Sequence, residues 1–271
     1  MLDRPLILLG CGKMGSAMLE GWMEIGLEKE QIYIIEPHQP TVDALRENDL
    51  KTFNSLGELP PDLEPEIVIF AVKPQTMDEA APAYSRYCSA NTTFLSIAAG
   101  KTIKYFEDIL GTDAIIVRAM PNTPASIRRG ITVAIGNARV SNTQQETCRK
   151  LLEAVGEVLW VENEELIDIV TALSGGGPAY VFLLTECMAQ AGIDAGLPAD
   201  LSNQLARVTV SGAGELMHKS NEKPAILRQN VTSRGGTTAE ALKILMAENG
   251  FQSLMTEAIA AATARSKELA Y

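Results

Sequence analysis

No other stretch limits the possible folds as strongly as residues 6–36. The apolar run "LILLG" (Leu6–Gly10) leads into the glycine-rich segment "GCGKMG" (Gly10–Gly15), and a second apolar run, "IYIIE", ends at Glu36. Between the two runs, apolar side chains recur at helical spacing on one face: Met14, Ala17, Met18, Trp22 and Ile25. A strand, a glycine turn and a helix that leads to a second strand make a βαβ unit. The chain is therefore predicted to contain a parallel sheet with helices packed on it.

The alternation of strands and helices continues to about residue 164. Seven short apolar runs bounded by turn-forming residues are predicted strands: Leu6–Gly10, Ile32–Glu36, Ile67–Val72, Thr93–Ala98, Ala114–Met120, Ile131–Ile135 and Glu157–Val161. Together they predict a Rossmann-like, doubly wound α/β domain over residues 1–164, with helices on both faces of the sheet. The proline-rich segment Glu58–Glu66 is predicted to be an exposed loop, because strand patterning resumes directly after it.

The remainder of the chain, residues 165–271, has a helical pattern without strand signals. Apolar residues there recur at helical spacing, as they do in Phe251, Leu254, Met255 and Ala258. The segment Ala179–Gly192 is apolar nearly all round, and a helical domain of this size could hardly bury such a helix alone. We therefore expect an all-α domain that forms a homodimer through its helices.

Composition excludes several classes of function. The 271 residues include 23 Lys and Arg against 34 Asp and Glu, and a formal net charge of -11 argues against a broad nucleic-acid surface. No basic leader precedes an apolar run, and no stretch of about 18 apolar residues occurs, so a cytoplasmic protein without membrane segments is expected. The four cysteines are scattered without a C-x-x-C pair, so neither a disulfide framework nor a metal site is predicted. The expected partners are small molecules and a second copy of the chain.

The glycine-rich segment predicts a site for a dinucleotide. Gly10 permits the tight turn, Gly12 lets the backbone approach a pyrophosphate, and Gly15 allows close helix packing. The helix that starts at Lys13 and Met14 offers free N–H groups and a positive dipole end to the phosphates.

Glu36 lies about 20 residues further on, at the end of the second strand, where an acidic residue can accept hydrogen bonds from a ribose. A carboxylate there repels a 2'-phosphate, so NAD(H) is favoured over NADP(H), although His38 or a shifted loop could accommodate the phosphate. The alternative is that Glu36 is only a solvated strand end.

Three further loops follow strand ends: "AVKPQ" (Ala71–Gln75), "SIAAG" (Ser96–Gly100) and "AMPNTPA" (Ala119–Ala125). Ligands of doubly wound sheets bind outside the carboxyl ends of the strands, so these loops should converge on the reactive end of the cofactor. Ordinary turn chemistry is the alternative for each loop taken singly. The residues expected to contact the cofactor here are Val72, Lys73, Pro74, Ala98, Ala99, Gly100 and Asn122.

The chain resembles the pyrroline-5-carboxylate reductases over its whole length. The resemblance rests on six motifs in order: "GCGKMG", "AVKPQ", "SIAAG", "RAMPNTPA", "SGGGPAY" and "VTSRGGTT". It implies an N-terminal dinucleotide domain, a helical domain that interlocks into a dimer, sometimes assembled into larger rings, and NAD(P)H-dependent reduction of 1-pyrroline-5-carboxylate to L-proline, the last step of proline biosynthesis. It also implies that "VTSRGGTT" (Val231–Thr238) opens a helix and binds substrate, with Thr238 near the ring nitrogen.

The residue types of Val231–Thr238 are suited to this chemistry independently of the family resemblance. Gly235 and Gly236 carry no side chain to block a ligand, so N–H groups around Gly236, Thr237 and Thr238 can hold a carboxylate, with Ser233 adding a hydroxyl donor. The Thr238 hydroxyl is too weak an acid to protonate the imine unaided, so we expect it to orient the substrate or relay a proton.

Other candidate residues carry more than one interpretation. "SGGGPAY" (Ser174–Tyr180), with Ser174 and Gly176, matches a family segment near substrate at the dimer contact, or it is a glycine-rich hinge before a helix. Arg234 stands where many family members have proline, and it either contacts a carboxylate or phosphate or projects into solvent. Lys73 is expected to contact cofactor or serve the fold, since reducing an imine requires no base to remove a hydroxyl proton.

Two other functions remain open from the residues. A hydroxyacid dehydrogenase or a different imine reductase would share this fold, because a fold does not fix a function. A non-catalytic, nucleotide-sensing dimer would keep the glycine-rich segment and lose the substrate segment. The intact "SRGGTT" favours an enzyme over that second alternative.

Overall fold

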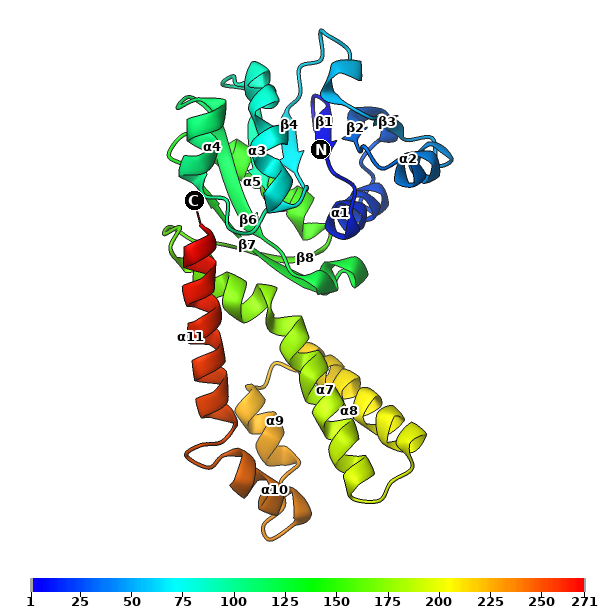
Figure 1. Cartoon of the computed structure of the whole chain (residues 1–271), viewed down its shortest axis with the longest axis vertical. Coiled ribbons are helices and arrows are strands. Elements are labelled where there is room, and N and C mark those ends of the chain that lie inside the picture. Colours follow the sequence, from blue (N-terminus) through cyan, green and yellow to red (C-terminus); the bar gives the residue numbers. More distant parts are fainter. Residues whose placement is uncertain (1, 271) are drawn as a thin grey trace. The chain divides into compact units, whose positions relative to one another are not determined.

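The computed structural model describes residues 2–270, which form two compact units (Figure 1). One unit comprises the described residues up to Gly175 together with those from Ala262 onward, and the other comprises Gly176–Ala261. Residues 165–175 and the end of the last helix therefore make most of their contacts within the first unit. A functional boundary between residues 164 and 165 remains a prediction.

The first unit is built on an eight-stranded sheet in the order β3-β2-β1-β4-β5-β6-β7-β8. Every predicted strand is present, and the strands are β1 (Leu6–Leu9), β2 (Ile32–Ile35), β3 (Lys51–Phe53), β4 (Ile67–Phe70), β5 (Thr93–Ser96), β6 (Ile115–Met120), β7 (Gly130–Gly136) and β8 (Gly156–Trp160). The sequence did not predict β3, which has three residues and buries only Thr52. Such a short edge strand leaves too little apolar pattern to recognise.

One pair of strands departs from the predicted parallel arrangement. β6 and β7 are antiparallel, with Met120 opposite Val133, whereas the other neighbouring strands are parallel. Only a short 3-10 turn, η5 (Thr123–Ile127), connects β6 to β7. A parallel return needs a crossover of a dozen or more residues, so this short link forces the chain back as a hairpin.

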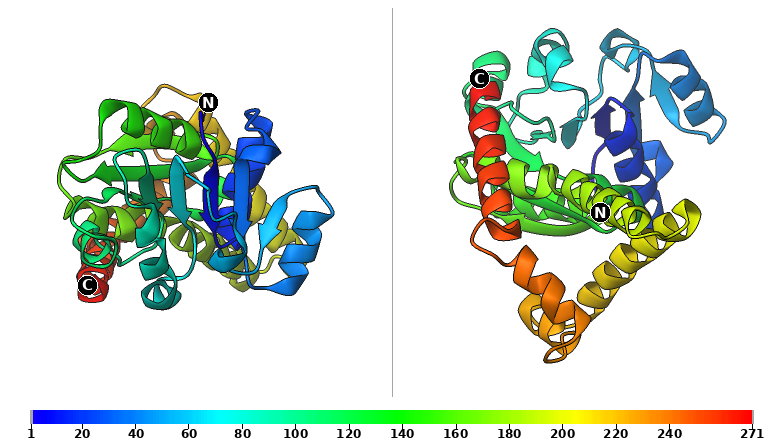
Figure 2. Two further views of the ribbon diagram at one scale, coloured as in Figure 1. Left: turned by 90° about the horizontal axis from the view of Figure 1, so that it is seen from above. Right: turned by 60° about the horizontal axis from the view of Figure 1, so that its bottom comes forward.

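Helices cover both faces of the sheet, which the left view in Figure 2 shows with helical segments on either side. One face carries α1 (Lys13–Glu24) and α5 (Asn142–Glu153), which are joined by a hydrogen bond of 2.8 Å from Trp22 Nε1 to the Leu151 carbonyl oxygen. The fully buried Met18 and Trp22 confirm the predicted apolar face of α1. Ile25 is the exception at 42% exposed, because the helix ends before it.

The other face carries α3 (Met77–Ala80), the 3-10 segment η4 (Ala81–Tyr87) and α4 (Ile103–Leu110). Their aromatic rings meet those of the sheet: Phe70 of β4 stacks on Phe106 at 5.4 Å between ring centroids and meets Tyr84 edge-on at 5.5 Å. Such pairs add specific geometry to apolar burial. The remaining elements of this unit are η1 (Lys29–Gln31), α2 (Gln39–Arg46), η2 (Leu56–Glu58), η3 (Pro74–Thr76), α6 (Leu166–Val170) and a π-helical turn, η6 (Thr171–Gly175).

The second unit is helical, as predicted. Its elements are α7 (Gly177–Asp194), α8 (Ala199–Lys219), α9 (Pro224–Asn230), α10 (Thr237–Leu245) and most of α11 (Phe251–Leu269). Helices α7 and α8 form a hairpin in which the Ser202 hydroxyl donates to the Ala189 carbonyl oxygen at 2.6 Å. Gly192 lies against Ser202, and a β-carbon there would collide with the hydroxyl.

Helix α7 exposes a large apolar surface. Phe182 is 63% exposed, and Val181, Leu183, Leu184 and Met188 are also exposed. The segment Leu166–Asp194 is long and apolar enough to cross a membrane by length and composition alone, with a mean hydropathy of 1.4 in its apolar window. Large exposed apolar patches mark interaction surfaces, and a helix of this kind suits a subunit interface equally well.

Four cysteines are free thiols in this structure: Cys11, Cys88, Cys148 and Cys187. Burial raises the pKa of the Cys148 thiol to about 12, and burial is also the largest cause of the raised pKa of Cys11. Both thiols are therefore protonated near neutral pH and act as small apolar groups in the core.

Candidate functional site

The turn between β1 and α1 has the geometry that the glycine pattern predicts. Gly10 has φ +90°, and a β-carbon there would lie 2.8 Å from Val72 Cγ1. A β-carbon on Gly15 would collide with the Gly10 carbonyl oxygen, so α1 packs directly against the turn. Gly12 is different, since its β-carbon would meet no atom of the described residues within 4 Å, apart from its chain neighbours and its own helix. Gly10 and Gly15 therefore shape the turn, whereas Gly12 leaves open space at the start of the helix.

The start of α1 is free of competing groups. Lys13 and Met14 are its first residues, and its N-cap is Gly12, which has no side chain to accept a hydrogen bond from the N–H groups of the first turn. The first N–H groups of a helix have no acceptor within the helix and carry the positive end of its dipole. This uncapped turn, with open space above Gly12, fits the pyrophosphate of a dinucleotide.

Glu36 is buried, at 9% exposed, so it is not a solvated strand end. Its carboxylate accepts hydrogen bonds from two backbone N–H groups, from Cys11 at 2.8 Å and from His38 at 2.9 Å. The carboxylate thus ties the glycine turn to the loop after β2. A carboxylate offers about four lone-pair sites, so two accepted bonds leave capacity for a ribose hydroxyl.

Two of the predicted cofactor loops follow the neighbouring strands β4 and β5. After β4, Lys73 is exposed and its carbonyl oxygen accepts a 2.9 Å hydrogen bond from the Thr76 hydroxyl, which closes a turn around Pro74. After β5, the Ala98 N–H donates to the Ser96 hydroxyl at 3.2 Å, and Ala99 is exposed. These are ordinary turn bonds, and they leave Lys73 and Ala99 at the surface.

Gly100 ends the second of these loops, with φ +76°. A β-carbon on Gly100 would lie 2.9 Å from the carbonyl oxygen of Leu269, at the end of α11. The last turn of the last helix therefore backs the loop after β5. Only glycine combines this φ with so close an approach.

The third loop brings together two residues that the sequence assigned to different parts of the site. The Asn122 side chain accepts from the Ile131 N–H at 3.0 Å and donates to the Ser174 hydroxyl at 3.3 Å. Ser174 lies in the π-helical turn η6, and Gly175 beside it packs against Met120. Asn122 thus connects the β6–β7 hairpin to η6. Single π-turns within helices occur frequently at functional sites.

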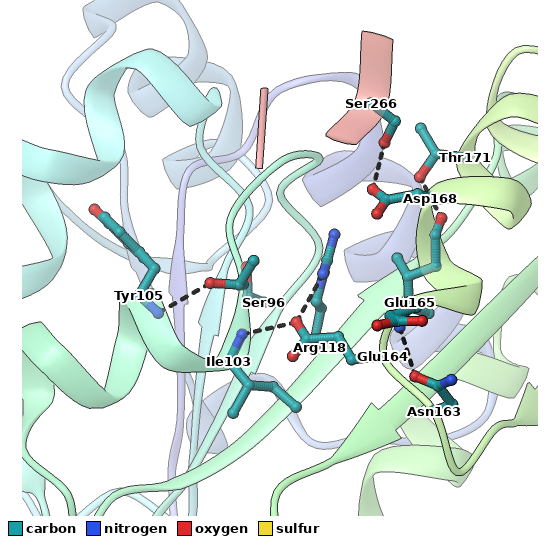
Figure 3. A network of polar contacts seen from close by, with 12 residues as sticks. Ser96, Ile103, Tyr105, Arg118, Asn163, Glu164, Glu165, Asp168, Thr171 and Ser266 are labelled. Atoms are coloured by element: carbon teal, nitrogen blue, oxygen red, sulfur yellow. Dashed lines mark hydrogen bonds and ion pairs between the residues drawn. The ribbon is translucent and has the colours of Figure 1, made fainter. Parts of the chain in front are cut away.

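A buried ionic network lies beside these loops (Figure 3). Arg118, only 2% exposed, donates from Nη1 to Glu164 Oε1 at 2.7 Å, and the same oxygen accepts from the Ile103 N–H at 2.9 Å. Nearby, the Ser266 hydroxyl of α11 donates to Asp168 Oδ1 of α6 at 2.7 Å. Arg118 is the first residue of the motif "RAMPNTPA", and no role was predicted for it from the sequence. An arginine in an otherwise apolar strand run is the signal for such a buried pair.

The segment Val231–Thr238 opens a helix, as the resemblance implies. Gly235 has φ +70°, Gly236 is the N-cap, and α10 begins at Thr237 without a side-chain cap. A β-carbon on Gly236 would lie 2.5 Å from Ser233 Oγ, so the serine hydroxyl sits over this glycine. We call Ser233–Thr238 the glycine nest. The Gly236 N–H donates to the Ser233 carbonyl oxygen at 3.1 Å, whereas the first N–H groups of α10 lack acceptors within the helix, an arrangement that binds carboxylates.

The side chains of the glycine nest are open to solvent within the second unit. Ser233, Arg234, Thr237 and Thr238 are all exposed. The exposure of Arg234 agrees with its projecting into solvent. The cofactor residues and Ser174 belong to the first unit, whereas the glycine nest and Gly176 belong to the second.

Comparison with known proteins identifies the family. Residues 164–269 match a family model for pyrroline-5-carboxylate reductase dimerisation, and residues 6–100 match one for NADP oxidoreductase, coenzyme F420-dependent. A pyrroline-5-carboxylate reductase of Pseudomonas aeruginosa is 38% identical over 266 residues, which cover 98% of this chain and 96% of the relative. The chain belongs to the pyrroline-5-carboxylate reductase family.

Solved structures of pyrroline-5-carboxylate reductases agree over the full length. The Coxiella burnetii enzyme is 32% identical with a TM-score of 0.92, and both chains are covered completely. The Plasmodium falciparum pyrroline carboxylate reductase with NADP bound is 30% identical with a TM-score of 0.83, again over 100% of both chains. The resemblance based on six motifs is therefore confirmed, as is the predicted order of a Rossmann-like unit and a helical region.

Proposed function

We propose that this chain reduces 1-pyrroline-5-carboxylate to L-proline with NAD(P)H, the last step of proline biosynthesis. The observation that carries the proposal is the similarity to pyrroline-5-carboxylate reductases over nearly the whole chain. The chain also has both the uncapped turn at Gly12 and the glycine nest. When bound, a dihydronicotinamide supplies a hydride for the imine carbon, and the imine nitrogen takes up a proton. The alternatives based on a hydroxyacid dehydrogenase or a nucleotide sensor lack such support.

In this proposal the first unit holds the dinucleotide. The N-terminus of α1 receives the pyrophosphate over Gly12, with Gly10, Lys13, Met14 and Gly15 forming the rest of the turn. The loops after β4, β5 and β6 contact the remainder of the cofactor through residues Val72, Lys73, Pro74, Ala98, Ala99, Gly100 and Asn122. The exposure of Lys73 and Ala99 supports this assignment, because neither residue is needed to fill the core.

The glycine nest holds the substrate carboxylate. Thr237 and Thr238 supply backbone N–H groups at the start of α10, and the Ser233 hydroxyl lies over Gly236. The Gly236 N–H, which donates to the Ser233 carbonyl oxygen at 3.1 Å, is a further contact that we propose. Thr238 orients the imine nitrogen or relays its proton, since a hydroxyl is too weak an acid to protonate it outright. Ser174 and Gly176 are the further substrate contacts that we propose. The protein's main contribution is to align donor and acceptor, which can account for much of the rate.

NADH is favoured over NADPH on the same proposal. The buried Glu36 carboxylate lies beside the glycine turn, where a 2'-phosphate would bring further negative charge. The expected partner is a second copy of the chain, bound through α7 and its neighbours, and larger rings of dimers fit the family resemblance. The exposed apolar face of α7 supports this homodimer. A cytoplasmic location accords with the composition.

One assay tests both the reaction and the cofactor preference. Purified protein is mixed with 1-pyrroline-5-carboxylate and either NADH or NADPH, and oxidation of the nicotinamide is followed. We expect turnover with both and a higher kcat/KM with NADH. No oxidation of either cofactor contradicts the proposed reaction, and a strong NADPH preference contradicts the role given to Glu36.

A further inference from the structure

A buried lysine connects the two loops that follow β4 and β5. Lys101, whose side chain is 7% exposed, comes directly after Gly100, and its ammonium donates to Asp78 Oδ1 at 2.7 Å. Asp78 lies in α3, just beyond the loop that contains Lys73 and Pro74. The same Asp78 oxygen accepts a 2.6 Å hydrogen bond from the Tyr105 hydroxyl. We call these contacts among Lys101, Asp78 and Tyr105 the loop bridge.

Two residues of the loop bridge, Asp78 and Tyr105, are each next to a fully buried residue of the core. Asp78 follows Met77, which is fully buried under the sheet, and Tyr105 precedes Phe106, which is also fully buried. The Lys101 ammonium lies 4.0 Å from the centroid of the Tyr105 ring, so the ring supports the cation as well. A desolvated ammonium held by a carboxylate and a ring face has few alternative positions. The bridge therefore restrains the exposed loop residues on either side of it.

We propose that Lys101 is a positioning residue for the dinucleotide, which it does not itself touch. By tying the loop after β5 to α3, it fixes the Ala98–Gly100 backbone relative to Val72–Pro74 before the cofactor arrives. This inference rests on the proposed function, because those two loops are the cofactor contacts proposed above. A preformed loop binds without an ordering cost, whereas a loop that is competent only part of the time binds in proportion to that fraction.

The chain offers a matched control for this idea on α4, the helix that carries Tyr105. Lys104 also forms an ion pair, with Asp108 at 2.8 Å, but both side chains are exposed and both belong to α4. Lys104→Met therefore removes a lysine and an ion pair without releasing a loop. Lys101→Arg retains a cation at the bridge and should recover part of what Lys101→Met loses.

The first measurement is the dissociation constant for NADH, from fluorescence titration of the intact protein. Lys101→Met and Asp78→Asn should raise it about five- to tenfold, while kcat at saturating NADH changes less than about threefold, because excess cofactor selects the competent loop. Lys104→Met should leave it within about twofold of the unchanged protein, the scale of a surface substitution. Asp78 is exposed, so Asp78→Asn remains informative if Lys101→Met does not fold.

The second measurement is amide hydrogen exchange of residues 97–101 in the protein without cofactor. Exchange should be faster in Lys101→Met and Asp78→Asn and unchanged in Lys104→Met. Unchanged exchange and NADH affinity in both bridge variants would overturn the proposal. So would a lower Tm with unchanged NADH affinity, because the bridge would then only stabilise the fold.

The proposed function and the loop bridge can fail separately. Protein that binds NADH but does not reduce 1-pyrroline-5-carboxylate contradicts the reaction, and the affinity comparison still decides the role of Lys101. Protein that catalyses the reaction, with bridge variants that bind NADH as well as the unchanged chain, contradicts the loop bridge alone.

Discussion

At the scale of single residues, the glycines fall into two groups: those that the backbone conformation requires and those that it does not. Gly10 and Gly100 have positive φ and close neighbours, so the backbone itself requires them. Gly12 has φ -73° and open space where a side chain would stand, so nothing in the fold requires it. We therefore propose that Gly12 leaves space for a ligand, since a side chain there would occupy the position expected for the pyrophosphate.

This division predicts opposite effects for two neighbouring substitutions. Gly12→Ala should leave stability within about 0.5 kcal/mol, since it meets no atom and keeps an allowed φ, yet raise the NADH dissociation constant at least about tenfold. Gly10→Ala should cost about 1–3 kcal/mol of unfolding free energy, because of its φ of +90° and the Val72 contact. Urea unfolding and NADH titration of both variants measure the difference. Equal NADH affinity in Gly12→Ala and the unchanged protein would remove the pyrophosphate from this position.

The Thr238 hydroxyl allows a similar separation of chemistry from folding. Thr238→Ala should lower kcat/KM for 1-pyrroline-5-carboxylate about 10- to 100-fold, the size of a hydrogen bond to a charged group, with little change in NADH affinity. Thr238→Ser keeps the hydroxyl and should recover most of the loss. Steady-state kinetics with each variant check this, and full activity in Thr238→Ala would exclude the hydroxyl from the reaction.

At the scale of elements, strands and helices with strong periodicity were predictable, and features set by contacts distant in sequence were not. The seven apolar runs became strands, and the glycine nest became the start of α10. The antiparallel return from β6 to β7 was not predicted, although the short link between these two strands requires it. Lys101 was missed for another reason: its partner Asp78 is 23 residues away, and no local pattern marks a pair at that separation.

Helix α5 provides a prediction at the same scale. It begins with a complete capping box, in which the Ser141 hydroxyl accepts from the Gln144 N–H and the Gln144 side chain accepts from the Ser141 N–H. Ser141→Ala should destabilise the protein by about 1 kcal/mol, which corresponds to a Tm lower by roughly 2–4 °C. Thr143→Ala, an exposed change in the same first turn, is the control. Equal melting temperatures for the two variants would show that the cap adds no stability.

At the scale of the whole molecule, the second unit is notable for α7, which exposes apolar side chains on several sides. A single chain leaves Val181, Phe182, Leu183 and Leu184 exposed, although residues of this kind are usually buried. The family match over residues 164–269 describes this region as a dimerisation segment. A partner helix against α7 would remove this surface from water, so we expect stability and assembly to depend on each other.

Placing a charge on this face should dissociate the dimer. Phe182→Glu puts an uncompensated carboxylate into the expected interface, which is far costlier than leaving it in water. Light scattering coupled to size-exclusion chromatography should give the mass of one chain for Phe182→Glu and of an assembly for Glu186→Gln, an exposed change on the same helix. An unchanged mass for Phe182→Glu would place the interface elsewhere.

Because the end of α11 lies against Gly100, the first unit can be completed only after the last helix has been synthesised. Ser266 and Leu269 belong to the first unit, yet the whole second unit is translated between Gly175 and Ala262. At about 5–20 residues per second, the ribosome takes roughly 4 to 17 s over that insertion. During this interval the nascent sheet lacks the last turn of α11, which packs against the loop after β5 in the finished structure. The proposed dinucleotide site is thus completed late in translation, although its glycine-rich turn is among the first segments to emerge.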